Sequence, residues 1–160
     1  MTRRPASGAR LPALGSRGEG WVVLQFGLFA ALAVCGFVGE WPGGARGWLL
    51  IVGLLLVVAG GAVAVAAGAR LGRSLTPLPR PRGDALRDTG VYARARHPIY
   101  GGVLLVALGW SLARSPWALV PAGALWLLLR LKSEREELWL AECYPGYAAY
   151  RARVPRRFLG

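Results

Sequence analysis

The sequence predicts an all-α, polytopic membrane protein. We expect about four transmembrane helices, the last two forming a short hairpin, and then a cytoplasmic amphipathic helix. The first observation is that hydrophobic residues make up 54% of the 160-residue chain, more than a water-soluble domain of this size usually contains. The second is that they form long uninterrupted runs, two of which could each cross a hydrocarbon core of about 30 Å. The third is the placement of charge.

The twenty Lys and Arg residues alternate along the chain with the apolar runs. Four precede the first run, seven lie in 70–96 and seven in 130–157, whereas only Arg46 and Arg114 fall in the intervening connections. This is the positive-inside pattern of an even number of spans with both termini in the cytoplasm. We therefore predict an integral protein of a bacterial-type inner or plasma membrane. The net charge of +12 then reflects topology and attraction to anionic headgroups, and we expect no nucleic-acid partner.

Residues 1–20 contain four arginines, small residues and two prolines, which predicts a disordered basic leader. In the run 21–39, Gln25 is the only strongly polar residue, and the run 48–69 has none. We predict two transmembrane helices within 21–69.

A tight outer connection is predicted at 41–47, with Trp41 and Trp48 as interfacial anchors. The second span contains four glycines: Gly53, Gly60, Gly61 and Gly68. These glycines either let another helix approach closely or make room for the tail of a ligand, and we favour helix packing.

Residues 70–160 form the predicted functional core, which begins with a cytoplasmic loop. Three prolines at alternate positions prevent a regular helix in 71–83 and predict an extended run along the membrane surface. Pro98 is typical of the first residue of a helix, because the amide that proline lacks is not used there. The apolar stretch 98–131 is interrupted at 114–116, so it predicts a hairpin of two short antiparallel helices.

This hairpin should return Arg130 and Lys132 to the level of His97. Beyond the hairpin we expect the helix to leave the membrane and to end at the sequence Tyr-Pro-Gly, residues 144–146. A short amphipathic segment then follows on the headgroups. It has Tyr147, Tyr150 and Val154 on one side and Arg151 and Arg153 on another.

Two polar clusters could carry chemistry. His97 lies between Arg94 and Arg96 at a predicted helix start, where nearby positive charge and the helix dipole favour the neutral imidazole. His97 is either a functional group or only a cap or headgroup contact. Glu136 and Glu137, with Glu134 beside them, either pair with neighbouring cations or bind ribose hydroxyls and a cationic ligand next to the aromatic residues Tyr92 and Tyr100.

Several common sites have no support in the sequence. It has no phosphate-binding Gly-rich loop with Lys and Ser or Thr, and no Gly-x-Ser-x-Gly motif. With one histidine and two cysteines that lack metal-ligand spacing, no metal site is expected.

At four stretches the chain resembles a known enzyme superfamily. They are Gly90-Val91-Tyr92, Arg96-His97-Pro98-Ile99-Tyr100, Glu136-Glu137-x-x-Leu140 and Tyr147-x-x-Tyr150-x-x-x-Val154-Pro155-Arg156. In this order they resemble the signature of the isoprenylcysteine carboxyl methyltransferase and phospholipid methyltransferase superfamily. Its members are integral membrane enzymes that use S-adenosylmethionine.

The resemblance implies a cofactor pocket at the cytoplasmic membrane surface, covered by the C-terminal segment and open sideways to lipid. Glu136, or Glu137 if the register differs by one residue, would hold the ribose, and Lys132 would face the methyl acceptor. The other residues expected to bind the cofactor are Leu86, Arg87, Tyr92, His97, Pro98, Ile99 and Tyr100.

The expected function is therefore methyl transfer from S-adenosylmethionine to a lipid-like or small apolar acceptor. An isoprenylcysteine-type carboxylate, a phospholipid amine and a thiol all remain open. A carboxylate needs no general base, whereas an ammonium or thiol must first lose a proton, for which His97 or Glu137 is the nearest candidate. The alternative is a non-enzymatic membrane protein whose basic cytoplasmic face binds anionic lipid.

Overall fold

The structure, a computed structural model, describes residues 14–15, 18–72 and 86–159. These residues form α-helices and short 3-10 helices, with no strand among them, so the predicted all-α fold is confirmed. In chain order the elements are α1 (Glu19–Cys35), α2 (Gly43–Leu71), η2 (Gly90–Ala93), α3 (Pro98–Arg114), η3 (Pro116–Ala118), α4 (Leu119–Cys143) and α5 (Tyr147–Arg153).

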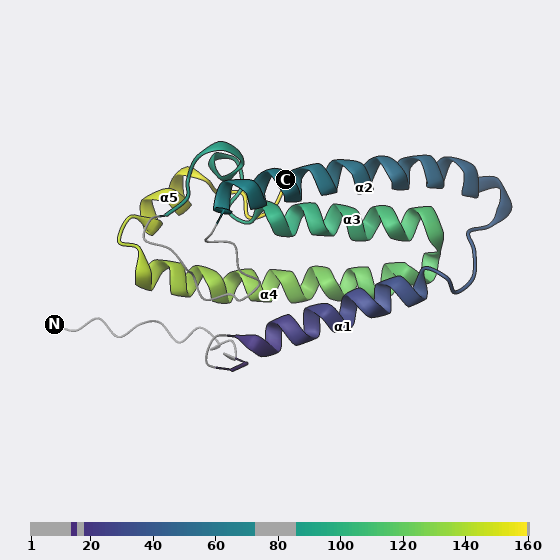
Figure 1. The fold of residues 1–160 in the computed structure, drawn as a ribbon, viewed down its shortest axis with the longest axis horizontal. Coiled ribbons are helices and arrows are strands. Elements are labelled where there is room, and N and C mark those ends of the chain that lie inside the picture. The colour runs from purple at the N-terminus through teal and green to yellow at the C-terminus, as the bar shows by residue number, and fades with distance from the viewer. Residues whose placement is uncertain (1–13, 16–17, 73–85, 160) are drawn as a thin grey trace.

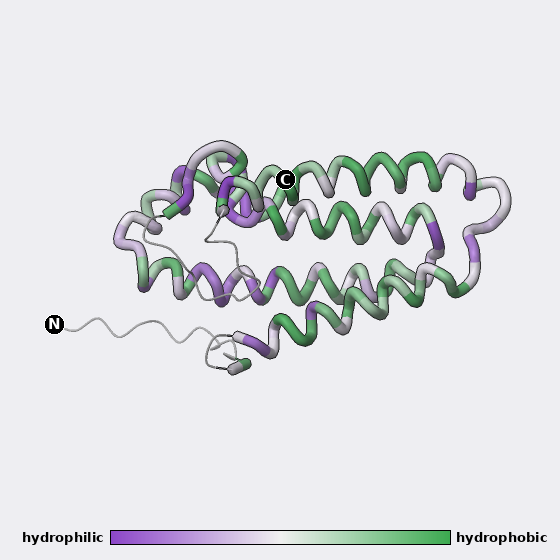
Figure 2. Tube along the Cα trace, in the orientation of Figure 1, coloured by the Kyte–Doolittle hydropathy of each residue, from purple (hydrophilic) through white to green (hydrophobic). Residues whose placement is uncertain are grey.

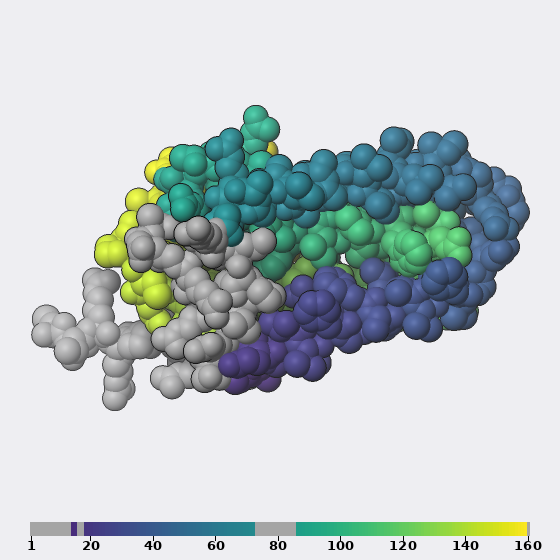
Figure 3. Space-filling model, in the orientation of Figure 1, coloured from purple at the N-terminus to yellow at the C-terminus, as the bar shows by residue number. Residues whose placement is uncertain are grey.

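The long helices lie side by side along the longest axis of the molecule (Figure 1). Their spatial order differs from their chain order, because α2 packs on α3, α3 on α4, and α4 on α1. In the space-filling view, α1 and α2 form opposite edges of one face, with α3 between them (Figure 3). The connection between α1 and α2 therefore spans the width of the bundle at one end.

The first predicted span, 21–39, is shorter in the structure and begins earlier. Helix α1 includes Glu19, which the sequence placed in the leader, and ends at Cys35. Gly36 follows directly and lies so close to Trp110 that an added Cβ would come 2.3 Å from the indole nitrogen. Gly39 has a φ of +68°, a left-handed conformation that glycine adopts readily. The rest of the predicted leader, 1–13 and 16–17, lies outside the described residues.

Helix α2 begins at Gly43, inside the connection predicted at 41–47, and pairs closely with α3. A Cβ added to Gly53 would lie 2.5 Å from the carbonyl oxygen of Gly109, and a Cβ on Gly60 equally close to that of Gly102. The same clashes arise in the opposite direction, at 2.5 and 2.6 Å. Helix packing is thus the role of Gly53 and Gly60, whereas Gly61 has open space beside it.

The hairpin predicted at 98–131 is confirmed. Helix α3 ends where Ser115 adopts an extended backbone (φ −159°, ψ 142°), and the Ser115 hydroxyl accepts a hydrogen bond from the Trp117 amide. The chain turns through η3 and returns as α4, antiparallel to α3 (Figure 1). As expected, α4 continues beyond Leu131 and ends at Cys143.

Of the helices in the described ranges, α2 is long and apolar enough to cross a membrane, while α1 and α3 are apolar but have only 17 residues each. Large apolar side chains of α1 and α2 point away from the protein, among them Val23, Val58 and Val65, each more than 70% exposed. Hydrophilic residues gather at the two ends of the bundle (Figure 2). The predicted four-span topology stays a prediction, and the extended run predicted at 71–83 lies outside the described residues beyond Gly72.

We predict that Gly60→Ala destabilises the protein by about 1–3 kcal/mol, because the new methyl group would meet a backbone carbonyl and force α2 and α3 apart. The midpoint of thermal unfolding in detergent measures this. Gly61→Ala is the matched control: the neighbouring position is open, so its midpoint should stay unchanged or rise slightly. Equal midpoints for both variants would show that close helix contact at Gly60 is unimportant.

Candidate active site

The segment between α2 and α3 brings the predicted histidine motif to one end of the bundle. Gly90 begins η2 with a φ of +64°, and Tyr92 within η2 is buried. The Tyr92 carbonyl accepts a 2.8 Å hydrogen bond from the hydroxyl of Tyr150 in α5. His97 then occupies the N-cap position of α3 without a capping hydrogen bond from its side chain, and Pro98 is the first residue of that helix, as predicted.

The C-terminal segment runs alongside this motif and closes over it. The backbone amides of Arg96 and His97 donate to the carbonyl oxygens of Arg156 (3.0 Å) and Arg157 (2.8 Å). The Arg96 guanidinium also donates to the carbonyls of Val154 and Pro155, both at 2.7 Å. One arginine side chain therefore fixes the chain that follows α5.

Glu137 is the centre of a buried charge cluster. Its carboxylate, 4% exposed, accepts from the Arg96 Nε at 2.9 Å and lies 3.2 Å from the His97 Nε2. Arg157 and Arg151 follow at 3.5 and 3.7 Å. Burial alone would raise the pKa of Glu137, but His97 and Arg96 outweigh it and hold the pKa at about 2. Glu137 is therefore ionised throughout the physiological range.

Glu136 occupies the other side of the same imidazole and is more accessible, at 17% exposed. One of its oxygens lies 3.2 Å from the His97 Nδ1, and the other accepts a 3.1 Å hydrogen bond from the Tyr100 hydroxyl. The rings of His97 and Tyr100 are stacked, with centroids 5.5 Å apart and planes 3° from parallel. Glu136 thus presents a carboxylate beside two aromatic faces.

The predicted neutral state of His97 is wrong. Burial lowers its pKa, but hydrogen bonds to Glu136 and Glu137, together with their charge, raise the pKa above its ordinary value of 6.5. The prediction assumed that the arginines next to His97 in the sequence would disfavour its protonation. In the fold Arg96 turns its charge to Glu137, and both ring nitrogens of His97 face carboxylates. The structure therefore favours the imidazolium form near neutral pH.

Lys132 is almost fully buried, one turn of α4 before Glu136. It lies at the level of Tyr100, with its Nζ 5.3 Å from the centre of that ring, whereas the level of His97 is occupied by Glu136 and Glu137. Its Nζ donates a 2.7 Å hydrogen bond to Gln25 of α1. Burial lowers the pKa of Lys132, and Glu136 opposes that effect.

The structure brings together most, but not all, of the predicted site. Pro98 is buried and Ile99 partly buried at the start of α3. Leu86 packs instead against Tyr147 and Tyr150 of α5 and against Val154, which directly follows that helix. The protein itself therefore covers the apolar side of this segment, and the predicted position of the segment on the headgroups stays a prediction. Arg87 is exposed.

Four residues of the cluster were not predicted as site residues: Gln25, Arg96, Arg151 and Arg157. Gln25 had a signal, because it is the only strongly polar residue in an otherwise apolar run. Polar residues within membrane segments usually have a partner. Arg96 also had a signal, because it is the first residue of the motif Arg96-His97-Pro98-Ile99-Tyr100. The charge of Arg151 and Arg157 was already explained by topology.

Comparison with known families resolves what kind of protein carries this cluster. The model of the phospholipid methyltransferase family matches residues 48–146, more than half of the chain. The chain belongs to the phospholipid methyltransferase family. The matched range begins inside α2, contains α3, α4 and the motif around His97, and stops before α5. Neither the curated proteins nor the solved structures gave a match.

Membership of this family agrees with the resemblance found in the sequence and indicates a methyltransferase. Within the ranges that the structure describes, no group of three or more His, Cys, Asp or Glu side chains is arranged to hold a metal ion. What the cluster offers is a buried network of cations around Glu137 and an accessible carboxylate, Glu136, at its edge.

We predict that acid destabilises this family member through Glu137. Because its pKa is about 2 in the fold against an ordinary 4.5, its contribution is complete above pH 4.5 and is lost as the pH falls from 4.5 towards 2. Denaturation midpoints measured across this range should fall in the parent. In Glu137→Gln stability should already be lower at pH 7, by about 3–5 kcal/mol, because buried Arg96 loses its partner.

The control for this experiment is Glu134→Gln. Glu134 pairs with Arg130 and Arg157 but is 35% exposed, so its removal should cost less than about 1 kcal/mol. An acid profile of Glu137→Gln that matched the parent would contradict the assignment of Glu137 as the titrating group.

Proposed function

We propose that the protein transfers a methyl group from S-adenosylmethionine to a lipid-like acceptor at the cytoplasmic membrane surface. The observation that carries the proposal is the position of Glu136. It is a partly exposed carboxylate next to the stacked rings of His97 and Tyr100, within the range that matches the methyltransferase family. A carboxylate and aromatic faces are the groups that bind ribose hydroxyls and a cationic ligand.

The residues present fit this cofactor. Glu136 rather than Glu137 is our candidate for the ribose, because the oxygens of Glu137 are already surrounded by Arg96, His97, Arg151 and Arg157. The hydroxyl of Tyr147 is buried and has no hydrogen-bond partner among the described residues. A buried hydroxyl in this state is available to a ligand.

When bound, the cofactor supplies an already activated sulfonium methyl, so neither a metal nor a covalent nucleophile is required. The chain's task is to hold the acceptor in line and exclude water. We assign the holding of the acceptor to Lys132, whose ammonium group would attract an anionic portion of that molecule. Gln25 fixes the position of the Lys132 ammonium by accepting a hydrogen bond from it. The C-terminal segment, which Arg96 holds in place, contributes to the exclusion of water.

A lipid-like acceptor is supported by the family description and by the exposed apolar surface of the helices. Neither base candidate favours an acceptor that must lose a proton. The glutamates raise the pKa of His97, which favours its protonated form, and the pKa of Glu137 is held at about 2, which makes it a weak base. A carboxylate acceptor needs no base, whereas a phospholipid amine or a thiol would transfer its proton elsewhere.

For the membrane we propose four spans with both termini in the cytoplasm. Helix α2 supports this by its length, and the outward apolar side chains of α1 and α4, such as Phe26 and Val120, support it by their exposure. Helix α1 begins at the same end of the bundle at which α5 lies (Figure 1), which places both ends of the described chain on the side of the Glu137 cluster.

We predict that the detergent-solubilised protein binds S-adenosylhomocysteine saturably in a calorimetric titration. His97→Ala and Glu136→Gln should each weaken binding at least about tenfold, because a charge-assisted hydrogen bond or an aromatic face is lost. Glu142→Gln is the control, an exposed carboxylate on the same helix. If the folded parent protein did not bind S-adenosylhomocysteine in detergent or in lipid, the non-enzymatic lipid-binding alternative would be favoured.

Methyl transfer to defined acceptors tests the role of Lys132. With phosphatidylethanolamine and farnesylcysteine as probes and labelled methyl donor, Lys132→Met should raise the acceptor KM at least about tenfold and leave the affinity for S-adenosylhomocysteine within about twofold. Gln25→Leu should shift KM in the same direction by less, since it removes only the group that positions Lys132. Equal losses of cofactor and acceptor binding would argue that Lys132 serves the fold rather than the acceptor.

A further inference from the structure

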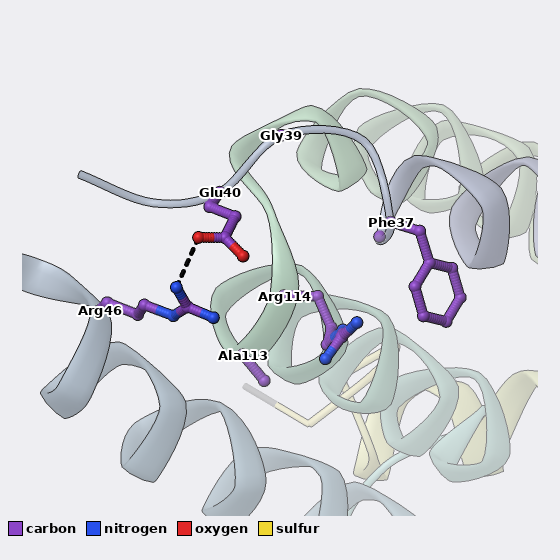
Figure 4. A pocket seen from close by; sticks show the side chains of 7 residues that line it. Phe37, Gly39, Glu40, Arg46, Ala113 and Arg114 are labelled. Atoms are coloured by element: carbon purple, nitrogen blue, oxygen red, sulfur yellow. Dashed lines mark hydrogen bonds and ion pairs between the residues drawn. The ribbon is translucent and has the colours of Figure 1, made fainter. Parts of the chain in front are cut away.

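A second cluster of charge lies at the other end of the bundle from Glu137, where α1 turns into α2 and α3 into α4. A cavity of about 240 Å³ opens there. Figure 4 shows the side chains of Phe37, Glu40, Arg46 and Arg114 around it. The cavity brings together Arg46 and Arg114, the two basic residues that the charge pattern of the sequence left unexplained.

We infer that this cavity binds a phosphate group, presented by the headgroup of a phospholipid in the outer leaflet. The assignment goes beyond methyl transfer and is independent of it, but its leaflet rests on the four-span topology proposed above. Arg46 lies in the first turn of α2 and Arg114 is the last residue of α3, at the end of the bundle where the positive-inside pattern disfavours basic residues. The two arginines are far apart in the chain and line one cavity, which gives them a shared role.

The charge of the cavity favours an anion. Arg46 forms an ion pair with Glu40. In the described part of the chain Arg114 forms no ion pair. Its guanidinium instead lies 4.8 Å from the ring centre of Phe37 and 5.8 Å from that of Trp110. Two guanidinium groups and one carboxylate leave one positive charge, which a phosphate diester would neutralise.

The lining is held in place by contacts that do not involve the arginines. The Trp41 indole donates to the Ser111 carbonyl at 3.1 Å, and the Ser115 hydroxyl donates to the Val38 carbonyl. Gly36 and Gly39, which line the cavity, lie directly against Trp110 and Trp117. The connection that follows α1 is therefore fixed on α3 and η3, so the cavity is formed before any ligand arrives.

Size and surroundings indicate a lipid headgroup as the source of the phosphate. A cavity of about 240 Å³ is smaller than the roughly 300–1,000 Å³ of a typical pocket for a drug-sized ligand, so it fits a headgroup and leaves acyl chains outside. The Trp48 and Trp117 side chains at this end are 56% and 59% exposed, as in the tryptophan belts at membrane interfaces. The planar, always charged guanidinium is also the side-chain group best matched to a phosphate.

Titrations of the full-length protein in a non-ionic detergent test the inference. The probes are dihexanoyl phosphatidylglycerol and inorganic phosphate, with tryptophan fluorescence as the readout. The parent should bind the lipid saturably, and Arg114→Gln and Arg46→Gln should each weaken binding at least about tenfold. Arg114→Lys, which keeps the charge but not the planar fork, should have an intermediate effect. Arg130→Gln, an exposed arginine at the opposite end, is the matched control.

The outcomes separate the two sources of phosphate and the two proposals. Inorganic phosphate that binds as tightly as the lipid, with the same dependence on Arg114, would assign the cavity to a soluble anion. No saturable binding of either probe, by parent protein whose unfolding midpoint matches that of the variants, would overturn the site. Titration of Arg114→Gln with S-adenosylhomocysteine should give the parent's affinity, so failure of the methyltransferase proposal is seen independently.

The leaflet has its own test. Gly44 has open space beside it and follows the start of α2. In a background where Cys35 and Cys143 are replaced by serine, Gly44→Cys should react with a membrane-impermeant maleimide added outside intact cells. Labelling only after the cytoplasmic face is exposed would overturn the outer-leaflet assignment.

Discussion

The structure depends above all on one buried carboxylate, Glu137. Three segments of the chain meet at it: the motif before α3, helix α4, and the run after α5. A buried anion is costly unless cations compensate for it. Arg96 and His97 do so while their backbone amides hold the C-terminal run. Removing any of these partners leaves charge buried and unpaired. Because Arg96 both pairs with Glu137 and holds the C-terminal run, the ion pair and the position of that run depend on each other.

The bundle that carries this cluster is organised by a different constraint, the close approach of α2 and α3. Where Gly53 meets Gly109 and Gly60 meets Gly102, the two backbones come closer than any side chain would allow. Without a strong hydrophobic force between helices in lipid, such contacts and interhelical hydrogen bonds provide the association. On the other side of the bundle, Lys132 and Gln25 supply a hydrogen bond of this kind between α4 and α1.

These constraints place two polar regions at opposite ends of one apolar body. At one end, Glu137 is buried among cations, whereas Glu136, which contacts His97 and Tyr100, is more accessible and is our candidate for the cofactor site. At the other end, Arg46 and Arg114 line a cavity that no cytoplasmic reaction requires. The proposed cofactor site and the proposed phosphate site therefore lie at opposite ends of the same helices.

The sequence by itself determined the helices, the hairpin and the family. Each depends on local pattern: apolar runs, proline at a helix start, the break at Ser115, and short motifs such as Arg96 to Tyr100. Only the tertiary structure decided the ionisation of His97, the partners of Glu137 and the pairing of Lys132 with Gln25. The physical reason is separation along the chain. Arg96 and Glu137 are 41 residues apart and Lys132 and Gln25 are 107 apart, so no local pattern could show which charges would meet.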